Sequence, residues 1–343
     1  MLDVLDELFA NEEAWVVGGA VRDHALDRPV VDVDIAVREP RTAARKLAKH
    51  AGGAPFLLSE RHGAWRVALD GGRTVDFTPL PGPIEEDLAK RDFTINAIAE
   101  RVGSGEFRDP YNGFGDLAGN RIRALQDGVF EDDPLRLLRA VRLEDELGFR
   151  IVPETEELIR RQVELVTQPA GERILVELRR LSAGGYRRLD GLGLLAPLGG
   201  RIDDRLDRWD SPDYRLVAVF GDELRRLPVS NGLRRFAAAL LRAEAPEPDA
   251  RAIHRFRRAT EPWALEALAF AGASELGQAI EEARANDPAE PLLRGDELDL
   301  PPGPEIGRLL AEIEEERAAG TIATREEALD YARRHAGSVR EDG

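Results

Sequence analysis

The stretch of residues 16–37 constrains the fold most strongly, because it predicts a strand, a glycine turn, a helix and a second strand in direct succession. Val16 and Val17 form a short apolar run, and the pair Gly18-Gly19 follows it. Glycine allows backbone angles that other residues resist. A helix that opens at such a turn presents free backbone N–H groups and a positive dipole end. The stretch therefore predicts a phosphate-binding turn.

The second strand of this stretch, residues 30–37, carries Asp32 and Asp34. Side chains alternate along a strand, so both carboxylates point to one face, about 7 Å apart. The apolar residues that alternate with them are expected to point into a core: Val31, Val33 and Ile35. Paired carboxylates repel each other unless they share a cation, and Mg²⁺ commonly binds one or two carboxylates plus substrate phosphates. The pattern indicates phosphoryl or nucleotidyl transfer; the alternative is an edge strand with solvated acids.

Composition bounds the remaining possibilities. The chain has 343 residues, which predicts two or more domains. It contains no cysteine, which excludes disulfides and thiolate metal sites, and its five histidines are scattered, which argues against a zinc or HD-type phosphohydrolase site. No apolar run is long enough to span a membrane and no signal peptide is visible, so the cytoplasm is the expected compartment. The net charge of −17 does not exclude nucleic acid, because phosphate binding needs only a local basic patch.

The run GGAVRD followed by DVDIAV resembles the signature of the class II tRNA nucleotidyltransferase and bacterial poly(A) polymerase family, within the larger polymerase-beta-like group. The resemblance implies an α+β fold. A head with a small mixed sheet and helices is expected over residues 1–125, followed by three all-α parts. These are a neck over 126–190, a body over 191–270 and a tail over 271–343.

Residues 85–99 (EEDLAKRDFTINAIA) resemble the second motif of the family. Arg91 can hold a triphosphate through two hydrogen bonds. By the same resemblance Asp92 accepts a ribose hydroxyl and so selects NTP over dNTP. Asn96 is expected one helical turn further on, where it supports Asp92. The alternative is that Asp92 is only the N-cap of a core helix.

Residues 131–142 (EDDPLRLLRAVR) resemble the motif that selects the base. Asp133, Arg136 and Arg139 are spaced to form one stripe of a helix. In the family an Asp and an Arg here act as a protein template for the incoming base. A carboxylate accepts from the exocyclic amine of cytosine or adenine, and Arg donates to a ring nitrogen or carbonyl oxygen. The alternative is an N-capped amphipathic helix with surface ion pairs.

Two further segments complete the expected head. Asp76, between two apolar strand residues, is the candidate for a third metal-binding carboxylate, although a solvent-facing strand residue fits the pattern equally well. Residues 59–66 occupy the place of the mobile loop of the family and carry Arg61, His62 and Arg66 as candidate substrate contacts.

The later part of the chain resembles the family more loosely. Residues 109–113 match the hinge between head and neck, and Glu172, Arg173 and Glu177 match residues that brace the base-selecting helix. Arg-rich helices are expected in the body, with a solvated helix face as the alternative. Their candidate RNA contacts are Arg234, Arg235, Arg255, Arg257 and Arg258. Residues from 292 resemble the tail of bacterial CCA-adding enzymes, and disorder is expected from residue 337.

The resemblance implies template-independent addition of CCA to the 3′ acceptor end of tRNA from CTP and ATP, with release of pyrophosphate. Asp32 and Asp34 would hold two Mg²⁺ ions, and Gly18, Gly19 and Arg22 would shape the triphosphate side. Addition of CC only, of A only or of a poly(A) tract is the alternative within the class, and a catalytically inactive tRNA-binding protein is the alternative outside it. Protein partners and oligomeric state cannot be predicted from the sequence.

Overall fold

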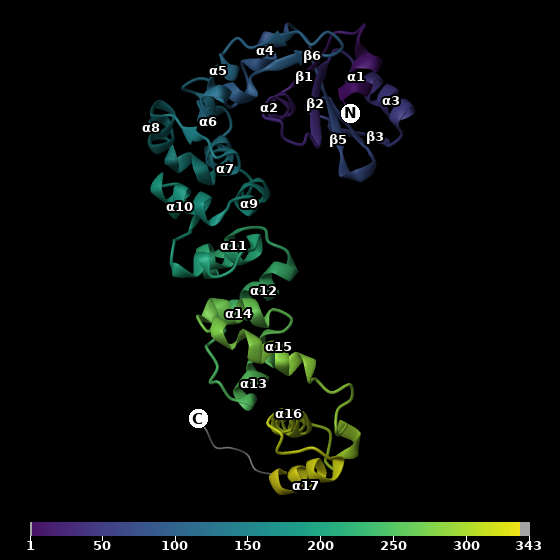
Figure 1. Cartoon of the computed structure of the whole chain (residues 1–343), viewed down its shortest axis with the longest axis vertical. Helices are drawn as coiled ribbons and strands as arrows, with labels where there is room; N and C mark the ends of the chain where they lie inside the picture. Colours follow the sequence, from purple (N-terminus) through teal and green to yellow (C-terminus); the bar gives the residue numbers. More distant parts are fainter. Residues whose placement is uncertain (1, 337–343) are drawn as a thin grey trace. The chain divides into compact units, whose positions relative to one another are not determined.

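The computed structural model describes residues 2–336. It contains two compact units, Met1–Gly199 and Gly200–Gly343 (Figure 1). The predicted division into head, neck, body and tail is finer than these units, and its internal boundaries stay predictions. No helix among the described residues has both the length and the apolar character needed to cross a membrane.

A seven-stranded sheet with the order β3-β4-β5-β2-β1-β6-β7 forms the start of the first unit. Its strands are β1 (Ala14–Val17), β2 (Asp32–Val37), β3 (Ala54–Ser59), β4 (Ala64–Ala68), β5 (Thr74–Pro79), β6 (Ala99–Arg101) and β7 (Phe107–Arg108). β2 and β5 pair in parallel, whereas the other neighbours are antiparallel, so the sheet is mixed as predicted. The parallel register places Asp34 directly opposite Asp76.

The apolar side of β2 and β5 belongs to a core that α1 (Leu2–Phe9) and α3 (Pro40–Ala51) help to form. Val33 and Ile35 are buried as predicted, and the Phe9 and Phe77 rings lie 5.8 Å apart. Val31 was expected in this core, but it is 49% exposed. The reason is that β2 begins only at Asp32, so Val31 lies in the turn before the strand.

The described residues of the first unit contain eight further α-helices besides α1 and α3. They are α2 (Gly19–Ala25), α4 (Ile84–Leu88), α5 (Gly113–Ala118), α6 (Val129–Asp132), α7 (Arg136–Leu147), α8 (Pro153–Arg161), α9 (Gly171–Arg179) and α10 (Ala183–Gly191). The two-residue strands β8 (Arg121–Ile122) and β9 (Arg150–Ile151) form a small parallel ladder beside α7.

The described residues of the second unit form helices joined by loops, without a β-strand. Its α-helices are α11 (Pro212–Phe220), α12 (Asn231–Leu241), α13 (Ala250–Thr260), α14 (Ala264–Ala271), α15 (Gly277–Ala285), α16 (Pro304–Ala318) and α17 (Arg325–His335). Thr324 and Glu327 form a capping box that starts α17. The disorder predicted from residue 337 onwards falls outside the described residues.

The predicted hinge is firmly anchored to the turn that follows Asp92. The Asp109 carboxylate accepts hydrogen bonds from the backbone N–H groups of Gly113 (2.6 Å) and Phe114 (3.0 Å), which starts α5. Asp116 of α5 is buried and accepts a bond from the Thr94 hydroxyl at 2.8 Å. α5 therefore packs directly on residues 92–96.

Replacement of Gly113 by alanine is expected to destabilise the first unit, because a Cβ here would lie 2.3 Å from the carbonyl oxygen of Thr94. Such overpacking costs about 1–3 kcal/mol, which a lower midpoint of urea denaturation would reveal. Gly128→Ala is the matched control, since its Cβ would meet nothing within 4 Å. Equal effects of the two substitutions would contradict close packing of α5 on this turn.

Candidate active site

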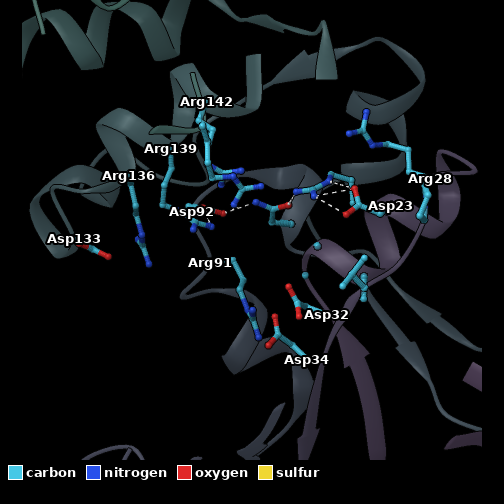
Figure 2. Close-up of a pocket in the computed structure, with 18 of the residues that line it drawn as sticks. Asp23, Arg28, Asp32, Asp34, Arg91, Asp92, Asp133, Arg136, Arg139 and Arg142 are labelled. Carbon is cyan, nitrogen blue, oxygen red and sulfur yellow. Dashed lines mark hydrogen bonds and ion pairs between the residues drawn. The ribbon is translucent and has the colours of Figure 1, made fainter. Parts of the chain in front are cut away.

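One cavity of about 1080 Å³ in the first unit brings most of the predicted site residues together (Figure 2). The predicted residues that line it are Gly18, Gly19, Arg22, Asp32, Asp34, Arg91, Asp92, Asn96, Asp133, Arg136 and Arg139. Asp76 does not line the cavity, although it lies opposite Asp34 in the sheet. The lining also includes residues that the sequence did not single out, among them Arg28, Arg142 and Arg180.

The carboxylate pair lies at the start of β2. Asp32 Oδ1 accepts a hydrogen bond from the Thr74 hydroxyl at 2.7 Å, which fixes its orientation. Figure 2 shows Asp32 and Asp34 side by side, with the Arg91 side chain ending beside Asp34. Burial raises the pKa of Asp34; Arg91 opposes this shift, and the nearby charges of Asp76 and Asp32 add to it. An acidic cluster of this kind is stabilised by a bound cation.

Asp76 is already engaged by a cation of the protein. Arg66 donates from Nε and Nη2 to its two carboxylate oxygens at 2.6 and 2.7 Å. These hydrogen bonds raise the pKa of Arg66. Asp76, the predicted third carboxylate, therefore lies beside Asp34 in the sheet, but its oxygens bind Arg66.

The segment 59–66, which was expected to be a loop, contains the turn of a β-hairpin and the strand residues on either side of it. β3 runs to Ser59 and β4 begins at Ala64, so only residues 60–63 form the turn. Arg66 is a strand residue, which explains its direct contact with the neighbouring strand β5. Arg61 and His62 are exposed on the turn.

The carboxylate oxygens of Asp32 and Asp34 suit a divalent cation whose other ligands come from the substrate. The described residues contain no group of three or more His, Cys, Asp or Glu side chains placed to bind a metal ion. Two carboxylates remain, Asp32 and Asp34. A hard cation with two carboxylates takes its other ligands from water and from substrate phosphates.

The glycine turn brings the backbone close to the pair. Gly18 has a φ of +72°, which strongly favours glycine, and a Cβ on it would lie 3.2 Å from Arg91 Nη1. Gly19 begins α2. Arg22 of this helix donates to Asn96 Oδ1 at 2.7 Å and pairs with Asp23 at 2.8 Å. Arg22 therefore holds the turn against residues 92–96.

Asp92 is 5% exposed, and protein donors reach both its oxygens. Oδ1 accepts from the Phe93 N–H and from Asn96 Nδ2, each at 2.9 Å, and Oδ2 accepts from Arg139 Nε at 2.8 Å. Burial opposes ionisation, but Arg139 and these hydrogen bonds outweigh it and hold the pKa of Asp92 below its usual range. The predicted helix here is wrong: Thr94–Asn96 is a 3₁₀ turn, and Asn96 reaches Asp92 within it.

The stripe predicted for Asp133, Arg136 and Arg139 is also wrong, because Asp133 lies outside the helix. Its backbone is extended (φ −148°, ψ 99°) between α6 and α7. Pro134 follows it, and the residue before a proline is driven away from helical angles. Asp133 pairs with Arg173 at 2.8 Å. Arg136 opens α7 and donates to the Lys90 carbonyl oxygen at 2.6 Å, so both face the cavity from separate segments (Figure 2).

The predicted bracing of α7 by α9 is confirmed for Glu177, whereas Arg173 contacts Asp133, which precedes α7. Glu177 is buried and accepts from Arg142 Nε at 2.5 Å. Arg142 also pairs with Glu146 at 2.6 Å, and Arg180 pairs with the same Glu146 at 2.8 Å. The spacing of Arg142, three residues after Arg139 on the same helix, was the signal that could have identified it.

The Arg residues of the second unit divide into two groups. Four of the predicted RNA contacts are exposed: Arg234, Arg235, Arg255 and Arg258. Arg255 pairs with Glu315 of α16. Arg257 is only 8% exposed and pairs with the more exposed Asp287, so little of its side chain is open to RNA, and its RNA contact stays a prediction.

Known proteins resemble this chain in sequence. The model of the Poly A polymerase head domain matches residues 14–80 and 71–123. The A-adding tRNA nucleotidyltransferase of Deinococcus radiodurans is 33% identical to this chain. The match covers 94% of this chain and 95% of the relative. The CC-adding tRNA nucleotidyltransferase of Thermus thermophilus is 30% identical, with 94% of each chain covered.

Solved structures share the fold. The Thermotoga maritima CCA-adding enzyme complexed with tRNA matches with a TM-score of 0.73 at 21% identity, over 97% of this chain and 94% of that one. A CCA-adding enzyme with CTP matches with a TM-score of 0.80 at 21% identity, over 98% and 95%. The predicted α+β architecture is thereby confirmed. The fold and the full-length relatives identify a nucleotidyltransferase. The chain belongs to the tRNA nucleotidyltransferase family.

Substitution of Arg139 by methionine is expected to destabilise the first unit by about 3 kcal/mol at neutral pH, because it leaves the Asp92 carboxylate buried without its cation. In the parent protein the folded-state pKa of Asp92 is depressed. The Asp92–Arg139 pair therefore contributes its full stabilising free energy above the ordinary carboxyl pKa of about 3.9. This contribution is lost as the pH falls through the lower pKa of Asp92 in the folded state.

In the Arg139→Met protein burial instead raises the pKa of Asp92, so the penalty should shrink as the pH falls from about 7 to about 4.5. Urea denaturation at both pH values measures this difference. Arg160→Met, which removes an exposed pair with Glu156, should cost about 0–1 kcal/mol at either pH. A large Arg139→Met penalty that does not change with pH would contradict the assignment.

Proposed function

We propose that the protein adds CCA to the 3′ end of tRNA from CTP and ATP, without a nucleic-acid template and with release of pyrophosphate. One observation carries this proposal: the Asp32–Asp34 pair, the glycine turn and the Asp133–Arg136 pair face a single cavity. The first two features suit transfer of a nucleotidyl group, and the third suits selection of a base.

Asp32 and Asp34 would hold Mg²⁺, the cation that best suits two carboxylates completed by substrate phosphates. When bound, the metal would activate the RNA 3′-hydroxyl and neutralise the departing pyrophosphate. Thr74 keeps Asp32 oriented for this task through its hydroxyl. Arg91, beside Asp34, is the candidate for binding the triphosphate.

The ribose and the base would be held on the other side of the cavity. Asp92 keeps its negative charge because Arg139 stabilises it, and a ribose hydroxyl would be accepted in place of one of its present donors. Asp133 is positioned by Arg173 and can accept from the amine of cytosine or adenine. Arg136 can donate to the same base. Arg139 acts mainly by positioning Asp92, and Asn96 supports it.

The RNA body would be bound by the second unit, where Arg234, Arg235 and Arg258 offer exposed cations. We place head, neck, body and tail at residues 1–125, 126–190, 191–270 and 271–343, as the sequence predicts. The cytoplasm is the compartment where tRNA and both nucleotides would be met.

Partial addition is the second candidate. Two relatives that match this chain over nearly its whole length are named as an A-adding and a CC-adding tRNA nucleotidyltransferase, which are names for one part of the reaction each. The cavity geometry alone suits C and A equally, because both bases present an exocyclic amine.

The deciding experiment uses purified protein with Mg²⁺, CTP and ATP and tRNA transcripts that end at the discriminator base, after C or after CC. Sequenced products completed to CCA on every transcript, with addition then stopping, are the expected result. Addition of only CC or only one A would assign the partial function. Long A tracts would indicate a poly(A) polymerase, and bound tRNA without any incorporation would indicate an inactive binding protein.

A further inference from the structure

A row of side chains crosses the sheet from its free edge to the carboxylate pair. Phe56 of β3 lies opposite Arg66 of β4, Arg66 lies opposite Asp76 of β5, and Asp76 lies opposite Asp34 of β2. Directly opposed residues in a sheet point to the same face. These four residues therefore share one face, and we call Phe56, Arg66 and Asp76 the acceptor row.

This face of the sheet differs from its reverse. Val67, Val75 and Phe77, which alternate with the row, have no solvent exposure and form part of the core. Phe56 is instead 44% exposed, and the Arg66 side chain is 35% exposed. β3 is the last strand at its end of the sheet, so the aromatic ring stands at an open edge.

The position of the row relative to the cavity suits the second substrate of a transfer reaction. Among the described residues that line the cavity are Asp32 and Asp34, but none of Phe56, Arg66 and Asp76. An attacking hydroxyl must approach phosphorus in line with, and opposite to, the departing pyrophosphate. With the triphosphate in the cavity beside the glycine turn, the acceptor end must come from the β5 and β4 side of the carboxylates.

The chemistry of the row matches single-stranded RNA. Proteins hold single strands with exposed aromatic rings, on which bases stack, and with cations that bind the backbone. Arg66 is paired with Asp76 at 2.6 Å but remains partly exposed, so a phosphate can replace Asp76 as its partner. The exchange keeps Arg66 paired and leaves Asp76 free to face Asp34 and a bound cation.

We propose that the acceptor row holds the 3′-terminal nucleotide of the RNA: Phe56 stacks on its base, and Arg66 binds its phosphate in exchange for Asp76. The proposal rests on the proposed function in two respects, that the acceptor is RNA and that the triphosphate lies in the cavity beside the glycine turn. It adds two residues to the site and gives Asp76 a role that begins only when RNA is bound.

The test uses the full-length protein and a tRNA transcript with 2-aminopurine as its last nucleotide, whose fluorescence falls when the base stacks. Phe56→Ala should abolish the quenching and raise the KM for tRNA about tenfold, while the KM for the nucleotide stays unchanged. Phe107→Ala is the matched control, because Phe107 is 45% exposed on β7 at the opposite edge of the same sheet. It should leave quenching and both KM values unchanged.

The exchange at Arg66 is tested by salt dependence. Arg66→Gln should weaken tRNA binding and reduce the slope of log affinity against log salt by about one phosphate contact. Arg38→Gln, which removes an exposed pair with Glu13, should not change the slope. In an Asp76→Asn protein Arg66 no longer has to leave a carboxylate, so tRNA should bind more tightly than to the parent protein.

The proposal would be overturned if the 2-aminopurine fluorescence were quenched as strongly on Phe56→Ala as on Phe107→Ala. It would also be overturned if the slope of log affinity against log salt were unchanged in Arg66→Gln. These binding readouts decide it even where the parent protein transfers no nucleotide. If the parent protein transferred no nucleotide to tRNA, the proposed function would be refuted instead. Failure of the acceptor row and failure of the proposed function can therefore be told apart.

Discussion

The parallel pairing of β2 with β5 is the constraint on which the rest of the site depends. It places Asp34 opposite Asp76 and Asp32 opposite Thr74 on one open face, while Val33 and Ile35 close the core on the other. Concentrated negative charge results, and burial makes it costly at Asp34. Arg66 and Arg91 neutralise part of this charge from its two sides, and a divalent cation is the natural complement of the remainder.

A second set of charges joins the sheet to the helices that follow it. Arg22 holds Asn96, Asn96 holds Asp92, and Asp92 holds Arg139 of α7. The same helix carries Arg142, which Glu177 of α9 binds. The glycine turn at Gly18 and helix α7 thus share one hydrogen-bonded network, although they lie more than a hundred residues apart in the chain.

Much of this architecture could be predicted from local patterns, because β1, the glycine turn, α2 and β2 follow each other within one short stretch. The failures have identifiable physical causes. Thr94–Asn96 is held as a turn by contacts of Thr94 with the distant Asp116, which no local pattern shows. The extended backbone of Asp133 was visible in Pro134 but was outweighed by the helical spacing.

Contacts across strands and between helices were the least accessible to sequence reasoning. The pairing of Arg66 with Asp76 depends on the register of a hairpin whose turn had been taken for a longer loop. Arg257 lies on the buried face of α13 with Ile253 and Thr260, whereas its neighbour Arg258 is exposed, and the sequence pattern does not show that Asp287 pairs with Arg257. Alternation and helical period predict which face a residue occupies, but they do not predict what lies opposite.

The most direct measurement compares Asp32→Ala with Asp70→Ala, an exposed aspartate elsewhere in the head, in single-turnover incorporation on tRNA. Binding of the tRNA is measured on the same samples. The account predicts that Asp32→Ala loses at least about a hundredfold in transfer rate while tRNA binding and the Asp70→Ala rate stay normal. Full incorporation by Asp32→Ala would contradict the assignment of the carboxylate pair as the catalytic centre.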